Sequence, residues 1–187
     1  MADFQPTHPL GDVAALNAEF ASSERVSIVV REGFACAQIF AKKGKESDLA
    51  SKLKIGTTPG EASETDAFSA IPLSPGQWML VSKKDPAGFA ASMDKKIGRL
   101  GHVSDQSDSR VCIRVTGPDA RALMSRGCRL DLHPSVTSSG FCAQTNMAQT
   151  GVMIHQIDDQ PTYDLYVYSG FARSFWQWLS HTAHQFS

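Results

Sequence analysis

The chain has 187 residues, enough for one domain or for two small subdomains that share a core. Its 18 lysines and arginines nearly balance its 19 aspartates and glutamates, so a formal net charge of -1 shows no basic footprint for nucleic acid or an anionic membrane. No apolar run is long enough to span a bilayer and no signal peptide is visible, so we expect a cytoplasmic protein with no nucleic-acid or membrane partner.

The first half of the sequence predicts alternating strands and helices behind an N-terminal arm. Residues 1–24 show weak periodicity and are expected to form this arm, with a short helix at residues 13–20. Two runs of β-branched and aromatic residues, at 25–30 and 34–41, predict a hairpin or two adjacent strands. The elements expected next are a helix at 47–55, a loop at 57–66, strands at 68–73 and 77–82, and a helix that ends at Gly101.

Helix boundaries in this half are predicted from capping residues. Ser47 is the expected N-cap of the first helix after the two strands, and Gly56 is its stop. Asp85 and Pro86 predict the start of the next helix, because an aspartate accepts from free first-turn amides and proline has no amide hydrogen to lose. An apolar stripe at three- and four-residue spacing predicts that this helix packs on a sheet: Phe89, Met93, Ile97 and Leu100.

The second half repeats this order. Residues 101–109 are polar and predict a connector, residues 111–115 predict a strand, and Pro118 opens a helix that Gly127 ends. Three apolar side chains of that helix are expected to face inward: Ala120, Leu123 and Met124. The elements expected last are strands at 140–147, 151–157 and 163–168, and a helix from 170 to about 184 that Ser169 caps.

Short echoes indicate that the two halves are related. GFAAS at residues 88–92 and GFARS at residues 170–174 each open the last helix of a half. The pair Ile39 and Leu49 has the same spacing as the pair Ile113 and Leu123. We therefore expect an α+β fold with two β-α-β-β-β-α pseudo-repeats in one compact domain. The expected divisions are the arm at 1–24, a first subdomain at 25–101 and a second at 102–187.

The four cysteines show no CxxC spacing, and three of them lie in apolar, strand-like contexts. We expect buried, reduced thiols rather than a metal cluster. The cysteines are Cys36, Cys112, Cys128 and Cys142.

The stretch GPDARALMSRGCRLDLHP, residues 117–134, places Cys128, Asp131 and His133 within six positions. These side chains allow a metal site with a distant ligand such as Cys142, or they shape a turn. Structural zinc sites draw paired ligands from two arms and only one arm is present, which favours the turn. The alternating Leu130 and Leu132 then place Asp131 and His133 outward or against a partner.

The last helix carries an aromatic stripe on one face, which predicts ordinary core: Phe171, Phe175, Trp178, Leu179 and Phe186. Trp176 lies at the edge of this stripe and is either partly packed or a binding anchor. Trp78 in GQWML allows the same two interpretations. His181 and His184 fall away from the stripe and predict a solvated helix end.

No nucleophile elbow and no glycine-rich nucleotide-binding loop is present in the sequence. The residues alone therefore indicate an α+β protein without a recognisable active site.

The motif set resembles the gamma subunit family of heterotetrameric sarcosine oxidase. The family pattern is a GPxAR helix opening, a GCxLDLHP exit, a CAQT strand and a terminal FxxxxWxWL helix, and this chain carries each motif in that order. The matching residues are Gly117, Pro118, Ala120, Arg121, Gly127, Cys128, Leu130 to Pro134, Cys142 to Thr145, Phe171, Trp176, Trp178 and Leu179. LSPGQWML, at residues 73–80, is similar to the family's LGPDEWLL, although Gly76 and Gln77 replace the usual acidic pair. The small subunit of N-methylglutamate dehydrogenase is a close relative with similar motifs.

The resemblance implies a fold like the folate-binding domain of the glycine-cleavage T-protein. It implies partner subunits alpha, beta and delta, which would bind FAD, FMN, NAD, tetrahydrofolate and zinc. The holoenzyme would demethylate sarcosine oxidatively to glycine, with tetrahydrofolate as the one-carbon acceptor. The matched motifs carry no catalytic, cofactor-binding or metal-binding residue in the family, so none is expected here. A free-standing folate-binding or one-carbon-transfer protein of the same fold is the alternative.

Overall fold

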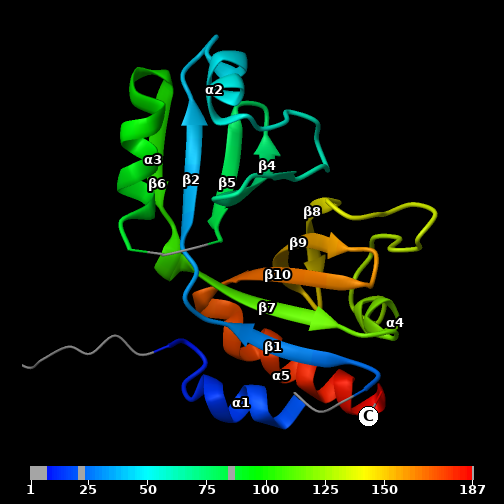
Figure 1. Ribbon diagram of the computed structural model, residues 1–187. Coiled ribbons are helices and arrows are strands. Elements are labelled where there is room, and N and C mark those ends of the chain that lie inside the picture. Colours follow the sequence, from blue (N-terminus) through cyan, green and yellow to red (C-terminus); the bar gives the residue numbers. More distant parts are fainter. Residues whose placement is uncertain (1–7, 21–23, 84–86, 187) are drawn as a thin grey trace, which may run out of the picture.

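The computed structural model describes residues 8–20, 24–83 and 87–186, and these form two antiparallel five-stranded sheets. Figure 1 shows the sheets one above the other, with their strands running in different directions and helices on the outer sides. The expected mixed α and β composition is therefore confirmed. No described helix is long and apolar enough to cross a membrane.

The first sheet has the strand order β3-β4-β5-β2-β6. Helices α2 and α3 pack on its outer face through a cluster that includes Leu49, Leu53, Met93 and Ile97. The bounds are β2 Cys36–Ala41, α2 Glu46–Leu53, β3 Ser63–Glu64, β4 Phe68–Ser74, β5 Gln77–Ser82, α3 Phe89–Ile97, the 3-10 turn η1 Gly98–Leu100, and β6 Gly101–Asp105.

The second sheet has the order β1-β7-β10-β9-β8. Helices α1, α4 and α5 contribute to the core on its outer face, which contains Leu123, Phe175 and Leu179. The bounds are α1 Val13–Phe20, β1 Ser27–Arg31, η2 Ser107–Ser109, β7 Arg110–Thr116, α4 Ala120–Met124, β8 Cys142–Met147, β9 Thr150–Asp158, β10 Thr162–Tyr168, η3 Ser169–Phe171, α5 Ala172–Ala183 and η4 His184–Phe186.

The two sheets exchange strands. β1 pairs with β7 of the second sheet, while β2, which follows it in the chain, belongs to the first sheet, so the hairpin interpretation is wrong. The segment expected as a polar connector forms β6 instead, which pairs with β2 at the edge of the first sheet. Polar and charged side chains are common on edge strands, where they discourage pairing with another chain. The boundary between the sheets therefore does not coincide with residue 101.

A third apolar cluster lies between the sheets and holds their inner faces together. It contains Cys36, Ile71, Met79 and Val81 from the first sheet, and Cys112, Cys142, Met153 and Tyr166 from the second. Both sheets are therefore buried on two faces over much of their area. This explains why their central strands are almost continuously apolar.

Three predicted helix ends differ from the observed ones. Helix α2 has Lys45 at its N-cap rather than Ser47, and it ends at Lys54, which is left-handed with φ 59°. The Ser169 hydroxyl donates to the carbonyl of Asp108 and does not cap α5. The predicted cap at Asp85 and the predicted helix start at Pro86 lie outside the described residues. Of the predicted stripe, Phe89, Met93 and Ile97 are buried on α3, whereas Leu100 lies in η1 and is half-buried.

Candidate interaction site

The segment after α4 forms a turn, as the sequence favoured. Leu132 is buried, whereas Asp131 and His133 are exposed. The carboxylate of Asp131 accepts the backbone N–H of His133 at 2.9 Å, and His133 Nδ1 lies 2.7 Å from the Ser135 hydroxyl. The polar side chains therefore hold the chain in its turn while remaining accessible to solvent.

The cysteines are free in the structure, and Cys36, Cys112 and Cys142 are buried as expected. Burial raises the pKa of the Cys36 thiol to about 12 and that of Cys142 to about 11. The half-buried Cys128 thiol also has a raised pKa because of desolvation. Among the described residues, no three histidine, cysteine, aspartate or glutamate side chains are grouped to hold a metal ion.

The sequence motifs meet one another in space. A Cβ at Gly127 would lie 2.5 Å from Cζ2 of Trp178, so the GCxLDLHP motif is packed directly against the terminal FxxxxWxWL helix. Gly117 of the GPxAR motif has φ 116°, and a Cβ there would collide with the backbone carbonyl of Arg25. These glycines are explained by close packing and backbone conformation.

Trp176 and Trp78, for which the sequence allowed either packing or a role as binding anchors, are both packed. Trp176 is 6% exposed and belongs to the core on the outer face of the second sheet. Trp78 is 1% exposed, and its indole N–H donates to the carbonyl of Gly56 at 2.9 Å. The packed interpretation therefore describes both residues. Phe171, expected in the core, is 58% exposed instead.

A cavity of about 880 Å³ opens between the two sheets beside Trp78. The β4–β5 turn and the start of β8 form its walls, with Pro72, Leu130 and Phe141 among the apolar side chains. The side chain of Gln144 spans the sheets and donates to the carbonyl of Leu73 at 3.2 Å. Most of the lining of this cavity is apolar, and the cavity contains few groups capable of acid–base chemistry.

A buried ion cluster lies at another place between the sheets. Asp164 is 1% exposed and accepts from Arg31 at 2.8 Å and from Arg114 at 2.7 and 2.9 Å. The neighbouring His155 is also buried, with Nε2 3.5 Å from a carboxylate oxygen of Glu64. Burial lowers the pKa of His155. This cluster joins β1, β7 and β10 through one carboxylate.

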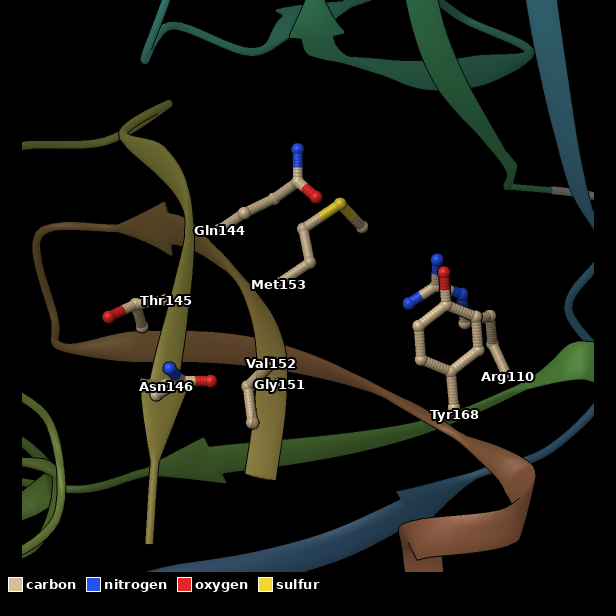
Figure 2. A pocket seen from close by; sticks show the side chains of 8 residues that line it. All are labelled: Arg110, Gln144, Thr145, Asn146, Gly151, Val152, Met153 and Tyr168. Carbon is tan, nitrogen blue, oxygen red and sulfur yellow. The ribbon is translucent and has the colours of Figure 1, made fainter. Parts of the chain in front are cut away.

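A second cavity, of about 290 Å³, lies at the end of the inner face of the second sheet. Figure 2 shows Arg110 and Tyr168 on one side of it and Gln144, Asn146 and Met153 on the other. The guanidinium carbon of Arg110 lies 3.5 Å from the centroid of the Tyr168 ring. Tyr168 is 48% exposed, so this aromatic and cationic pair faces solvent.

Sequence reasoning missed Arg110, Tyr168 and the Asp164 cluster. A signal was present, because Arg110 and Arg114 alternate with apolar residues along β7, as Asp164 and Tyr168 do along β10. Such alternation places the polar side chains on one face of a strand. The alternation was not recognised because residues on both faces of these strands are apolar and buried, so the polar face does not stand out in the sequence.

Comparisons with known proteins agree with the motif resemblance. The family model “Sarcosine oxidase, gamma subunit family” matches residues 32–185. Sarcosine oxidase subunit gamma of Corynebacterium sp. (strain U-96) is 25% identical over 134 residues, which cover 71% of this chain and 63% of that protein. The subunit gamma of Corynebacterium sp. (strain P-1) is 25% identical over 113 residues, covering 60% of this chain and 54% of that protein. The chain thus spans 54–63% of the length of these curated relatives.

Two solved structures share the fold. A chain of the heterotetrameric sarcosine oxidase from Corynebacterium sp. U-96, in complex with pyrrole 2-carboxylate, aligns with a TM-score of 0.84 at 22% identity, covering 97% of this chain and 96% of that chain. Glycine cleavage system aminomethyltransferase T from Bartonella henselae aligns with a TM-score of 0.62 at 15% identity, covering 92% of this chain and 49% of that chain. Both likenesses are consistent with the expected architecture. Because the family model matches most of its length, this chain belongs to the sarcosine oxidase gamma subunit family.

Proposed function

We propose that this chain is the gamma subunit of a cytoplasmic, heterotetrameric flavoenzyme similar to sarcosine oxidase, and that it supports the assembly without catalytic residues of its own. The family match over residues 32–185 carries the proposal, because it includes every motif described above. In this proposal the alpha, beta and delta subunits bind FAD, FMN, NAD, tetrahydrofolate and zinc. The holoenzyme demethylates sarcosine to glycine, with tetrahydrofolate accepting the one-carbon unit.

The geometry of the motif residues supports a structural role. Gly127 packs against Trp178, and Asp131 and His133 bind within their own turn. The buried thiols have raised pKa values and are protonated at neutral pH, so they are poor nucleophiles. The motifs thus preserve a shape that partner subunits recognise.

Co-expression with candidate alpha, beta and delta subunits tests the proposal. We expect affinity purification of this chain to recover a complex that contains large flavin-binding subunits, with yellow colour and sarcosine oxidation in the complex alone. Failure of the wild-type chain to recover any flavoprotein would contradict the proposal. Saturable binding of tetrahydrofolate to the isolated chain, measured by calorimetry, would favour the free-standing folate protein instead.

We also propose that the chain contains two related units, at residues 25–101 and 102–187, behind the arm at 1–24. The strand orders support this, because β3-β4-β5-β2-β6 and β8-β9-β10-β7-β1 correspond strand by strand. In each sheet the last strand is contributed by the other unit, and the strand beside it carries Ile39 or Ile113. Superposition of the two units in an experimental structure tests the relation.

A further inference from the structure

The inner face of the second sheet is covered by the first sheet over only part of its length. Cys112 on β7 and Tyr166 on β10 are paired across the strands and buried in the cluster between the sheets. The next pair on the same face is Arg110 with Tyr168, and Tyr168 is 48% exposed. The inner face of the second sheet therefore extends beyond the edge of the first sheet, and its side chains there are accessible to solvent.

Arg110 differs from the other arginines of this face in its ion pairing within the described part of the chain. Arg31 and Arg114 each bind Asp164, whereas no carboxylate among the described side chains of residues 8–18, 24–83 and 87–186 forms an ion pair with Arg110. Its Nε is buried without a hydrogen-bond partner in the described part of the chain, and partial burial lowers the pKa of its guanidinium. A half-buried cation on an aromatic ring gains from a carboxylate that replaces its lost water.

The cavity beside Arg110 has room for one side chain. Its volume is about 290 Å³, and Gln144 and Asn146 bring exposed amide groups to the wall opposite the guanidinium (Figure 2). The space above Gly151 is open, because a Cβ built there would meet no other atom within 4 Å. A guanidinium on one side of an open space and the Asn146 amide on the other suit the two oxygens of one carboxylate.

The surroundings favour a protein as the source of this carboxylate. Tyr168 and Phe171, three positions later, are both large and exposed, at 48% and 58%. Arginine and aromatic side chains that lie together are typical of the residues that dominate protein interfaces. We propose that Arg110 and Tyr168 anchor a subunit interface into which a partner inserts an aspartate or glutamate side chain. This inference rests on the proposed function, which supplies the partner subunits.

The test compares binding of full-length variants to the co-expressed subunits. Arg110→Gln removes the charge, and Gly151→Val adds a branched side chain in the open space, where a Cβ meets no other atom within 4 Å. We expect each substitution to weaken the complex on the order of tenfold or more. Arg110→Gln leaves the partner's buried carboxylate without a counterion, and Gly151→Val reduces the space that the carboxylate occupies. Arg99→Gln, at an exposed arginine of η1, is the matched control and leaves binding unchanged. Melting temperatures of the isolated variants are expected to stay close to that of the wild type.

Carbodiimide cross-linking tests the chemistry of the occupant. The Arg110→Lys variant in the assembled complex is expected to form an amide bond with a partner carboxylate, which mass spectrometry identifies, while Arg99→Lys forms none. Complexes of Arg110→Gln and Gly151→Val as stable as the wild type would overturn the inference and leave the proposed function intact. Absence of any complex with the wild-type chain would overturn both.

Discussion

Asp164 and Arg114 face each other across the β7–β10 pair, and the carboxylate of Asp164 accepts both Nε and Nη2 of the guanidinium, at 2.7 and 2.9 Å. The same carboxylate binds Arg31 of β1 at 2.8 Å. One buried acid therefore joins the edge strand β1 to its neighbour β7 and to β10, the next strand of the sheet. Asp164 is 1% exposed, so these two arginines take the place of water around its carboxylate.

We expect Asp164→Asn to lower the free energy of unfolding by roughly 3 kcal/mol, because it leaves two partly buried guanidinium groups without their anion. Urea denaturation of the isolated chain measures the loss. The control is Asp48→Asn, whose exposed pair with Lys45 should contribute less than about 1 kcal/mol. Equal effects of the two substitutions would show that Asp164 does not support the fold.

Trp176→Ala is expected to destabilise the fold by roughly 3–5 kcal/mol, because the side chain is 6% exposed and its removal leaves a cavity in the core. Phe171→Ala, one turn earlier and 58% exposed, should change stability by no more than about 0.5 kcal/mol. Thermal denaturation of both variants measures the difference. A stable Trp176→Ala chain that fails to bind partners would restore the surface-anchor interpretation.

The pH dependence of stability should reflect His155. Burial lowers its pKa below 6.5, so the unfolded chain binds a proton in a pH range where the folded chain does not. Its contribution to stability is thus complete above pH 6.5 and is lost as the pH falls toward the folded-state pKa. We expect His155→Gln to reduce the slope of unfolding free energy between pH 5 and 7, by at most about 1.4 kcal/mol per pH unit. Unchanged slopes in parallel denaturant titrations would contradict the assignment.

Thiol reactivity should be confined to one cysteine. At neutral pH we expect a chromogenic disulfide reagent to label the half-buried Cys128 in the native chain, and all four cysteines after denaturation. The others are buried, and the pKa values of Cys36 and Cys142 are raised to about 12 and about 11. Cys128→Ser should abolish native labelling. Rapid labelling of that variant would show that a second thiol is accessible.

Local sequence patterns were sufficient to predict the buried side of a single helix or short segment that packs on one apolar cluster. The stripe of Phe89, Met93 and Ile97 predicted the buried face of α3 because helical spacing alone brings these side chains together. Leu132, between two exposed polar residues, likewise followed from alternation. The turn formed by residues 128–133 was also predicted from the sequence.

Contacts between distant segments were not predictable in this way. The sequence favoured pairing of β1 with β2, since neighbouring strands usually pair, but β1 lies in the other sheet. Trp176 was ambiguous on its own helix, whereas α1 lies beside α5 in Figure 1 and contributes Val13 to the same apolar cluster. The Arg110 pocket depends on where the first sheet stops covering the second, which no local pattern encodes.

The exchange of β1 and β6 has a consequence for folding. The second sheet contains β1, which precedes every strand of the first sheet in the chain, and the first sheet contains β6, which follows β5, so neither sheet is complete until both edge strands are in place. The two sheets should therefore unfold together, in a single cooperative transition. A substitution that weakens one sheet should then lower the stability of both sheets together.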